Sequence, residues 1–354
     1  MNGRPRAVSR DQLSVRIERE LFLRSISDVR PNSAQLAQML SMLRDVAFEP
    51  GEEIYRRGEP CHRIYLITNG QVELRAPDSA PWQFSGSATI GILDAMMDQP
   101  YSRDAVAVTD AHALELEVGE YFEYLEDNYD LCQRSIAHNA ADLFELFLSL
   151  PDPRGLLEQV GDRGMLEPPD RPFSVVERLL VLRRVRPLAR ASIQALTSLA
   201  GLANEVRVRA GDTPFRQGDM SRSFWMIAYG QVLLQRDQPS ISAIRGAGEF
   251  VENYAAFGSQ QRQFNATAQT DVTILCIHEE DLFDRMEEHF DLTRSVLAFL
   301  ASERMKVNNV LSLADSWSSD PDADNDADQG ADIAAPASAD AGYGEKPAAV
   351  QETR

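Results

Sequence analysis

The stretch PGEEIYRRGEPCHRIYLITNGQVEL (Pro50–Leu74) is repeated 160 positions later as AGDTPFRQGDMSRSFWMIAYGQVLL (Ala210–Leu234). Eight aligned positions are identical without a gap, and three of these eight are glycines. The glycines stand between short apolar runs, as expected where a β-chain turns tightly and needs a backbone angle φ above zero. A single long repeat in each half of the chain predicts two similar domains rather than a solenoid of small units.

The length and composition agree with this organisation. A chain of 354 residues accommodates two domains of about 130–150 residues, each large enough to bury its own core. The 44% hydrophobic and 25% charged content is that of a soluble globular protein. No apolar run approaches the roughly 20 residues of a membrane span. The N-terminus lacks the apolar stretch of a signal peptide, so we expect a cytoplasmic protein.

The net charge of −20 is unevenly distributed. From Asp315 onward the chain has ten acidic and two basic residues, a net of −8, which leaves −12 for the remainder. Binding to a nucleic-acid backbone depends on Lys and Arg, so this balance argues against DNA or RNA as a partner. The acidic tail is rich in Asp, Ala, Gly, Pro and Ser, and we predict that it is disordered.

The order of helical and β-type patterns is the same in both halves. A helical pattern over residues 11–45 is followed by short β-runs to about Glu117, and then by a helical pattern from Gly119 to Leu150. After a linker containing five prolines and three glycines, the order helix, β-runs, helix repeats. The predicted organisation is an N-terminal segment (1–19), a first domain (20–150), a Pro/Gly-rich linker (151–173), a second domain (174–313) and the disordered tail (314–354).

Two patterns occur in both halves. The glycine spacing G-(x)6-G-(x)11-G-x-V is found at Gly51, Gly58, Gly70 and Val72, and at Gly211, Gly218, Gly230 and Val232. An R…A-x-x-D pattern follows as Arg103…Ala107-Val108-Thr109-Asp110 and as Arg262…Ala268-Gln269-Thr270-Asp271. With the helix pair after each β-region, each half resembles the cyclic nucleotide-binding domain. The resemblance implies an α+β chain of two tandem β-rolls of jelly-roll type, with about eight strands each and flanking helices.

In that family the ligand lies in a phosphate-binding cassette, where a Gly admits the ligand, a Glu accepts from the ribose 2′-hydroxyl and an Arg neutralises the phosphate. The first domain has the Gly and the Arg, as Gly91 and Arg103. Ile92 stands in place of the Glu, and Asp104 follows the Arg where a small hydroxyl residue is usual. A carboxylate there opposes an anionic ligand, so the resemblance implies weak or no nucleotide binding in this half.

The second domain departs from the pattern differently. It keeps Glu252 and Arg262, but Val251 replaces the glycine, and Gln263 and Phe264 replace the small pair after the Arg. The bulky side chains would crowd a phosphate. We expect neither half to bind cyclic AMP or cyclic GMP as a dedicated sensor does, and the second half to be the better candidate. The alternative is structural: each arginine pairs with a nearby carboxylate (Asp104 in the first domain), and Glu252 is a solvated surface group.

The sequence lacks the residues that other classes of function require. A cupin-type enzyme needs a His/Glu metal cluster, but the five histidines are scattered and show no HxH or HxxxH spacing. The sequence contains no GxSxG, Walker A or HExxH motif, and no helix-turn-helix follows either β-region. We therefore predict a non-enzymatic regulatory protein with no cofactor or metal, acting through a protein partner. The alternative is a cyclic AMP or cyclic GMP sensor that binds mainly in the second domain.

The helices that follow each β-region are the expected output elements, because in the family ligand binding moves the C-terminal helix. Ile136, Leu143 and Leu150 lie seven residues apart in the first of these helices. We interpret the series as the face that packs on its own roll, with a dimer or interdomain seam as the alternative. The sequence leaves the oligomeric state open, a dimer included.

Overall fold

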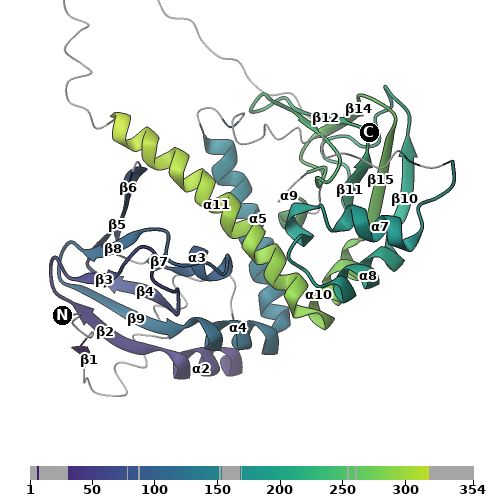
Figure 1. Cartoon of the computed structure of the whole chain (residues 1–354). Helices are drawn as coiled ribbons and strands as arrows, with labels where there is room; N and C mark the ends of the chain where they lie inside the picture. Colours follow the sequence, from purple (N-terminus) through teal and green to yellow (C-terminus); the bar gives the residue numbers. More distant parts are fainter. Residues whose placement is uncertain are drawn as a thin grey trace, which may run out of the picture.

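The two β-regions fold into separate rolls, with two long helices crossing between them (Figure 1). The computed structural model describes residues 6–7, 31–77, 79–86, 88–150, 153, 168, 170–252, 255–259 and 261–318. The predicted N-terminal segment, most of the linker and the predicted disordered tail lie outside these residues. The domain boundaries therefore stay predictions.

The first roll consists of two antiparallel sheets. One has the order β1-β2-β9-β4-β7, formed by β1 (Arg6–Ala7), β2 (Arg44–Phe48), β9 (Ala111–Glu117), β4 (Arg63–Asn69) and β7 (Ala88–Ile90). The other has the order β3-β8-β5-β6, formed by β3 (Glu53–Tyr55), β8 (Asp104–Ala107), β5 (Gln71–Ala76) and β6 (Ser79–Ser85). The eight strands expected for this roll are β2 to β9.

The second roll is built in the same way but has fewer regular strands. Its sheets have the orders β10-β15-β11 and β13-β12-β14, formed by β10 (Asn204–Val208), β15 (Val272–His278), β11 (Ser223–Tyr229), β13 (Ile241–Arg245), β12 (Val232–Arg236) and β14 (Asn265–Ala268). The expectation of about eight strands is wrong for this half, since six are described. Isolated bridges from Phe215 to Ala266 and from Met226 to Phe250 stand near the positions of β3 and β7.

The two sequence patterns form the same contacts in both rolls. The amide of Gly51 donates to Ala107 O over 2.7 Å, and that of Gly211 donates to Ala268 O over 2.8 Å. The third glycine of each repeat has a positive φ, and a Cβ there would approach a backbone oxygen to 2.4 Å at Gly70 and to 2.2 Å at Gly230. Only glycine fits so close an approach. The glycines of the repeat therefore determine where the chain turns and packs against the A-x-x-D segment of the same roll.

The helices flank the rolls. They are α2 (Ser33–Met42), α3 (Ile92–Met96), α4 (Val118–Asp127), α5 (Tyr129–Ser149), α7 (Val175–Leu182), the 3₁₀ turn η1 (Arg186–Leu188), α8 (Ile193–Leu202), α9 (Ala255–Gly258), α10 (Glu279–Glu288) and α11 (Phe290–Ser318). Ser174 caps α7, and its side chain and backbone exchange hydrogen bonds with Glu177 in a capping box. Among the residues described, no helix is long and apolar enough to cross a membrane.

The long helix of each domain packs on the other domain. α5 lies against α9 of the second domain, and α11 lies against α3 and β6 of the first. In the largest cluster of buried apolar side chains, α5 joins the interior of the second roll, and the cluster includes Ile136, Leu143 and Leu150. The interpretation that this series packs on its own roll is therefore wrong, and the interdomain seam is the one observed.

We expect that Gly258→Ala loosens the domain interface. A Cβ at this position would lie 2.4 Å from the backbone nitrogen of Ala141 on α5, so α5 and α9 would have to separate. Overpacking of this kind costs about 1–3 kcal/mol of unfolding free energy. Denaturant unfolding of the full chain measures it.

Gly201→Ala is the matched control, since Gly201 is also helical and a Cβ there meets nothing within 4 Å. That substitution should be neutral or stabilise the chain by up to about 1 kcal/mol. If the two alanine variants unfold alike, the close helix contact does not hold the domains together.

Candidate functional site

The cassette of the first domain begins where β7 ends. Gly91 is the N-cap of α3 and has φ +81°, in the left-handed region that favours glycine. A Cβ at Gly91 would lie 3.1 Å from the carbonyl oxygen of Arg63 and 3.2 Å from the ring of Tyr101. Gly91 is thus required by the turn itself, whether or not a ligand binds beside it.

Arg103 is the second predicted site residue, and its side chain is only 5% exposed. One guanidinium nitrogen donates to Ala80 O over 3.1 Å and to Leu74 O over 3.4 Å. The other donates to Asn309 Oδ1 on α11 over 2.8 Å. The guanidinium carbon lies 4.0 Å from the centroid of the Trp82 ring, in a cation–π contact. Arg103 is therefore held by the roll on one side and by the second domain on the other.

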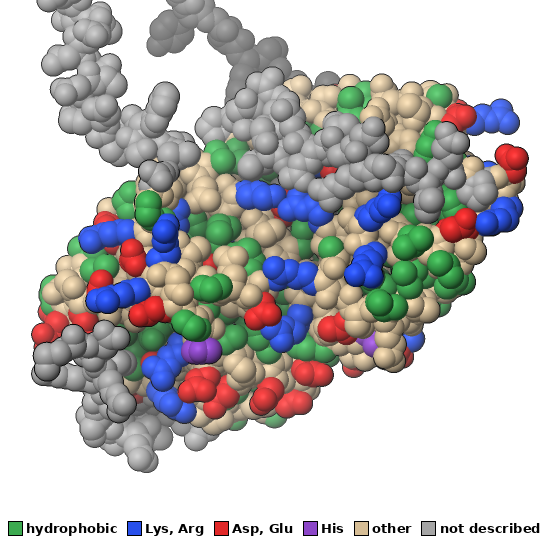
Figure 2. All heavy atoms as spheres, in the orientation of Figure 1, with side chains coloured by type: hydrophobic (Ala, Val, Ile, Leu, Met, Phe, Trp, Pro, Cys, Tyr) green, Lys and Arg blue, Asp and Glu red, His purple; other side chains and the backbone are tan. Residues whose placement is uncertain are grey.

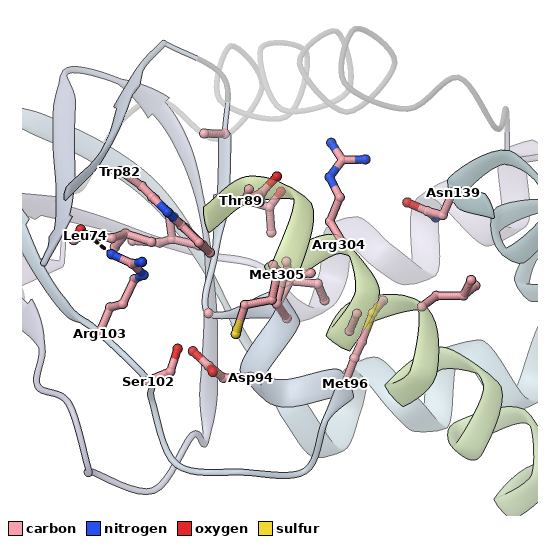
Figure 3. Close-up of a pocket in the computed structure, with 18 of the residues that line it drawn as sticks. Leu74, Trp82, Thr89, Asp94, Met96, Ser102, Arg103, Asn139, Arg304 and Met305 are labelled. Atoms are coloured by element: carbon pink, nitrogen blue, oxygen red, sulfur yellow. Dashed lines mark hydrogen bonds between the residues drawn. The ribbon is translucent and has the colours of Figure 1, made fainter. Parts of the chain in front are cut away.

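A cavity of about 370 Å³ lies beside Arg103. Its walls come from both domains: Ile90, Leu93 and Trp82 from the roll and α3, and Leu297, Met305 and Asn308 from α11. Figure 3 shows Arg103 next to Trp82 on the roll side, with Met305 pointing from α11 into the space between the domains. The site predicted for one domain is thus closed by a helix of the other.

Among the described residues, no carboxylate is hydrogen-bonded to the guanidinium of Arg103. In the described part of the chain, its hydrogen-bond acceptors are two carbonyl oxygens and one carboxamide oxygen. Asp104, expected as a salt-bridge partner, instead accepts a hydrogen bond from the backbone amide of Arg57 over 2.8 Å. Burial lowers the pKa of Arg103, and the negative charge of Asp94 opposes this effect. The predicted Arg103–Asp104 pair is not formed.

The cassette of the second domain is closed by its own side chains. Arg262 donates to a carboxylate oxygen of Glu252 over 2.8 Å, and both side chains are almost fully buried. The other carboxylate oxygen accepts from the amide of Gln263 over 2.7 Å. Burial raises the pKa of Glu252, while Arg262 and this amide favour the ionised form. The interpretation of Glu252 as a solvated surface group is therefore wrong, whereas a carboxylate partner for Arg262 is present.

Aromatic side chains enclose this ion pair. The guanidinium of Arg262 lies 4.4 Å from the ring centroid of Phe215 and 5.0 Å from that of Trp225. Phe264, expected to crowd a ligand, is buried and packs edge-on against Phe144 of α5, with centroids 6.0 Å apart. The two groups expected to bind ribose and phosphate are thus hydrogen-bonded to each other, and the neighbouring Phe264 packs on a helix of the first domain.

Sequence reasoning missed the α11 side chains, Asn309 and Met305 among them. They lie about 200 positions along the chain from the first-domain residues that they contact. A helical pattern in the sequence does not indicate which surface the apolar face of the helix covers. Trp82 was missed as well, and its buried indole Nε1 has no hydrogen-bond partner among the residues that the structure describes. Within the described residues no group of three His, Cys, Asp or Glu side chains could hold a metal ion.

A family model described as the cyclic nucleotide-binding domain matches residues 45–128 and 205–289. No curated protein matches the chain. The regulatory domain of Toxoplasma gondii PKA with cAMP is 14% identical, with 83% of this chain and 99% of that chain covered and a TM-score of 0.32. The regulatory subunit of a cAMP-independent protein kinase A from Trypanosoma cruzi, bound to guanosine, is 12% identical, with 90% and 94% covered and a TM-score of 0.30.

The N-terminal domain of a transcriptional regulator from Streptomyces coelicolor is also similar. It is 26% identical, with 37% of this chain and 94% of that chain covered, and the TM-score is 0.34. With TM-scores of this size, the assignment of both rolls rests on the sequence match, which falls on the two β-regions.

We expect Glu252→Ala to destabilise the second domain strongly. The substitution leaves Arg262 buried without a counter-charge, which costs about 3–5 kcal/mol of unfolding free energy. Glu288→Ala is the control, because Glu288 pairs with Arg285 at the surface and such pairs contribute less than about 1 kcal/mol. Chemical denaturation compares the two. Equal losses would mean that the buried pair does not stabilise the cassette.

Proposed function

Because the chain contains two tandem domains of the cyclic nucleotide-binding family, we propose that it is a non-enzymatic regulatory protein of the cytoplasm that does not read cyclic nucleotides and acts by contacting another protein. The observation that carries this proposal is the buried ion pair between Glu252 and Arg262. These are the two groups that the family uses for ribose and phosphate. In this chain each is satisfied by the other.

A cyclic nucleotide entering the second cassette would have to break this pair. Arg262 would exchange one anion for another, but Glu252 would exchange its ion pair for a hydrogen bond from a neutral ribose hydroxyl while remaining buried. A buried carboxylate that loses its counter-charge is strongly destabilised. The position that the sequence favours for ligand binding is thus the less suitable of the two.

The first cassette lacks the ribose contact instead. Ile92 occupies the position of the family's Glu, so the 2′-hydroxyl of a nucleotide would meet an apolar side chain. A buried hydroxyl without a hydrogen bond costs about 1–3 kcal/mol. Arg103 is also engaged by Asn309 of the second domain. Both departures support a pocket that does not select cyclic AMP or cyclic GMP.

Contact with a protein is supported by an exposed apolar surface on the second domain. Eight large apolar side chains are exposed among the described residues, and five of them lie on α7 and α8: Val175, Val176, Leu180, Ile193 and Leu202. Figure 2 shows apolar side chains at the surface where these helices lie, next to several Lys or Arg side chains. Arg183 and Arg184 follow directly after α7 and are exposed. The surface suits a partner with apolar side chains flanked by carboxylates.

Calorimetric titration tests the nucleotide part of the proposal. We expect neither cyclic AMP nor cyclic GMP to bind with micromolar or tighter affinity, because one cassette is closed by an ion pair and the other lacks its ribose contact. Micromolar binding that Arg262→Ala abolishes would instead establish the sensor alternative in the second domain.

Paired substitutions on α7 test the protein contact. Val176→Asp together with Leu180→Asp should remove any protein that the wild-type full chain retains in a pull-down, because both side chains are exposed on the same helix. Ile244→Asp is the matched control, since Ile244 is also exposed in the second domain but lies on β13. A partner that is retained equally by both variants does not bind at α7.

A further inference from the structure

A second cavity lies on the outer face of the first roll. Successive side chains of a strand point to opposite faces, so Tyr65 and Ile67 of β4 pack inside the roll, whereas Ile64 and Leu66 pack on its outer face. Helices cover this outer face, and between them and the sheet lies a space of about 380 Å³. We call it the outer cavity, and it is bordered by β4, β9, α2, α3, α4 and α5.

The outer cavity is distinct from the cavity beside Arg103. Leu74 and Trp82 line the cavity beside Arg103 from within the roll, and Arg103 is not among the residues that border the outer one. α3 contributes to both walls through Ile92 and Met96. A molecule in the outer cavity would therefore lie on the opposite side of β4 from Arg103.

Most of the wall of the outer cavity is apolar, with Leu116, Leu125 and Leu131 among its members. Its partly exposed polar side chains come from α5, and they include His138 and Asp142, which lie 3.6 Å apart. None of the described wall residues is Lys or Arg. Such a space suits an uncharged molecule, because a charged one would lose its hydration without gaining an adequate counter-charge.

A buried hydroxyl group belongs to this wall. Tyr124 is 2% exposed, and within the described part of the chain its hydroxyl has no hydrogen-bond partner. Burial raises the pKa of Tyr124 to about 12, and the negative charge of Asp130 adds to this effect, so the hydroxyl keeps its proton. The carboxylate of Asp130 accepts from Gln35 over 2.9 Å and pairs with Arg134 over 3.1 Å. Buried hydroxyls are normally hydrogen-bonded, so Tyr124 is a donor that lacks an acceptor.

We propose that the outer cavity is a ligand-binding site, that it takes an uncharged molecule with an apolar body and a carbonyl oxygen, and that Tyr124 donates a hydrogen bond to this oxygen. The apolar body would give the wall atoms the van der Waals contacts that an unfilled space denies them. The carbonyl oxygen would remove the penalty of a buried donor without a partner. The inference goes beyond the proposed function, because it uses neither cassette arginine.

A ligand in the outer cavity would act on the contact between the domains. Leu131 and Ser135 border the cavity and lie on α5, the helix that packs against α9 of the second domain. Leu131 also belongs to the cluster of buried side chains that includes the interior of the second roll. In a close-packed interior, a molecule that packs against one side of α5 changes the packing of that helix as a whole.

The first experiment examines the hydroxyl without any ligand. Tyr124→Phe removes a buried donor that has no described acceptor, so the full chain should unfold at the same temperature as the wild type or at a higher one. Tyr129→Phe is the matched control, because the Tyr129 hydroxyl donates to the carbonyl oxygen of Phe283 over 2.9 Å. That variant should unfold at a lower temperature. Equal losses in the two variants would mean that the Tyr124 hydroxyl has a structural partner, and the proposal would fail.

The second experiment uses acetophenone as the probe and calorimetric titration of the wild-type full chain as the measurement. We expect saturable binding of one molecule per chain. Ethylbenzene has the same body without the oxygen, and benzoate has a similar body with a charge, so each should bind about tenfold more weakly or worse. Acetophenone that does not bind, or that binds no better than ethylbenzene, would refute the site.

Variants locate the probe. Tyr124→Phe should weaken acetophenone about tenfold and leave ethylbenzene unchanged, because only the ketone can accept from the hydroxyl. Ser135→Leu should remove the binding of both molecules, since it fills the outer cavity from α5. Arg103→Gln should change neither affinity, because Arg103 borders only the other cavity. Acetophenone that binds equally to Tyr124→Phe and the wild type, or that is lost in Arg103→Gln, would overturn the proposal.

Discussion

The structure depends on the reciprocal contact in which α5 covers the cassette of the second domain and α11 covers that of the first. The contact leaves little room for adjustment, since Gly258 of α9 lies so close to the backbone of α5 that no side chain fits between them. Each roll contributes the surface on which the other's long helix is buried. Because side chains in such an interface are close-packed, a change in packing at one cassette also changes the packing of a helix of the other domain.

This arrangement gives the two arginines different environments. Arg262 lies inside its own domain between two aromatic rings, and its counter-charge comes from the same cassette. Arg103 lies at the seam, where the group that reaches it belongs to α11 and is neutral. The ion pair balances the charge of Arg262 within the second domain. The hydrogen bond from Arg103 to Asn309 instead joins the first roll to a helix of the second domain.

Much of the fold could be predicted from the sequence, because tight turns have local chemical requirements. Gly70 and Gly230 mark places where the backbone leaves no room for a Cβ, and such places are visible as spaced glycines. The cassette residues Gly91, Arg103, Glu252 and Arg262 could be located from the resemblance to the cassette pattern of the family. The surface against which a helix face packs has no such local requirement in the sequence. Ile136, Leu143 and Leu150 indicate a buried face, but the identity of the covering surface is a property of the whole fold.

The crossing of the long helices also affects the order in which the chain can fold during synthesis. Arg103 and Asn309 are separated by 206 positions, so the N-terminal roll leaves the ribosome long before the helix that closes its cavity. The apolar face of α5 likewise stays uncovered until α9 has been synthesised. Contacts between such distant segments form slowly, because a long loop of chain must first be closed. The nascent first domain therefore presents an apolar helix face until the second is complete, and apolar surface exposed in this way during synthesis is prone to aggregation.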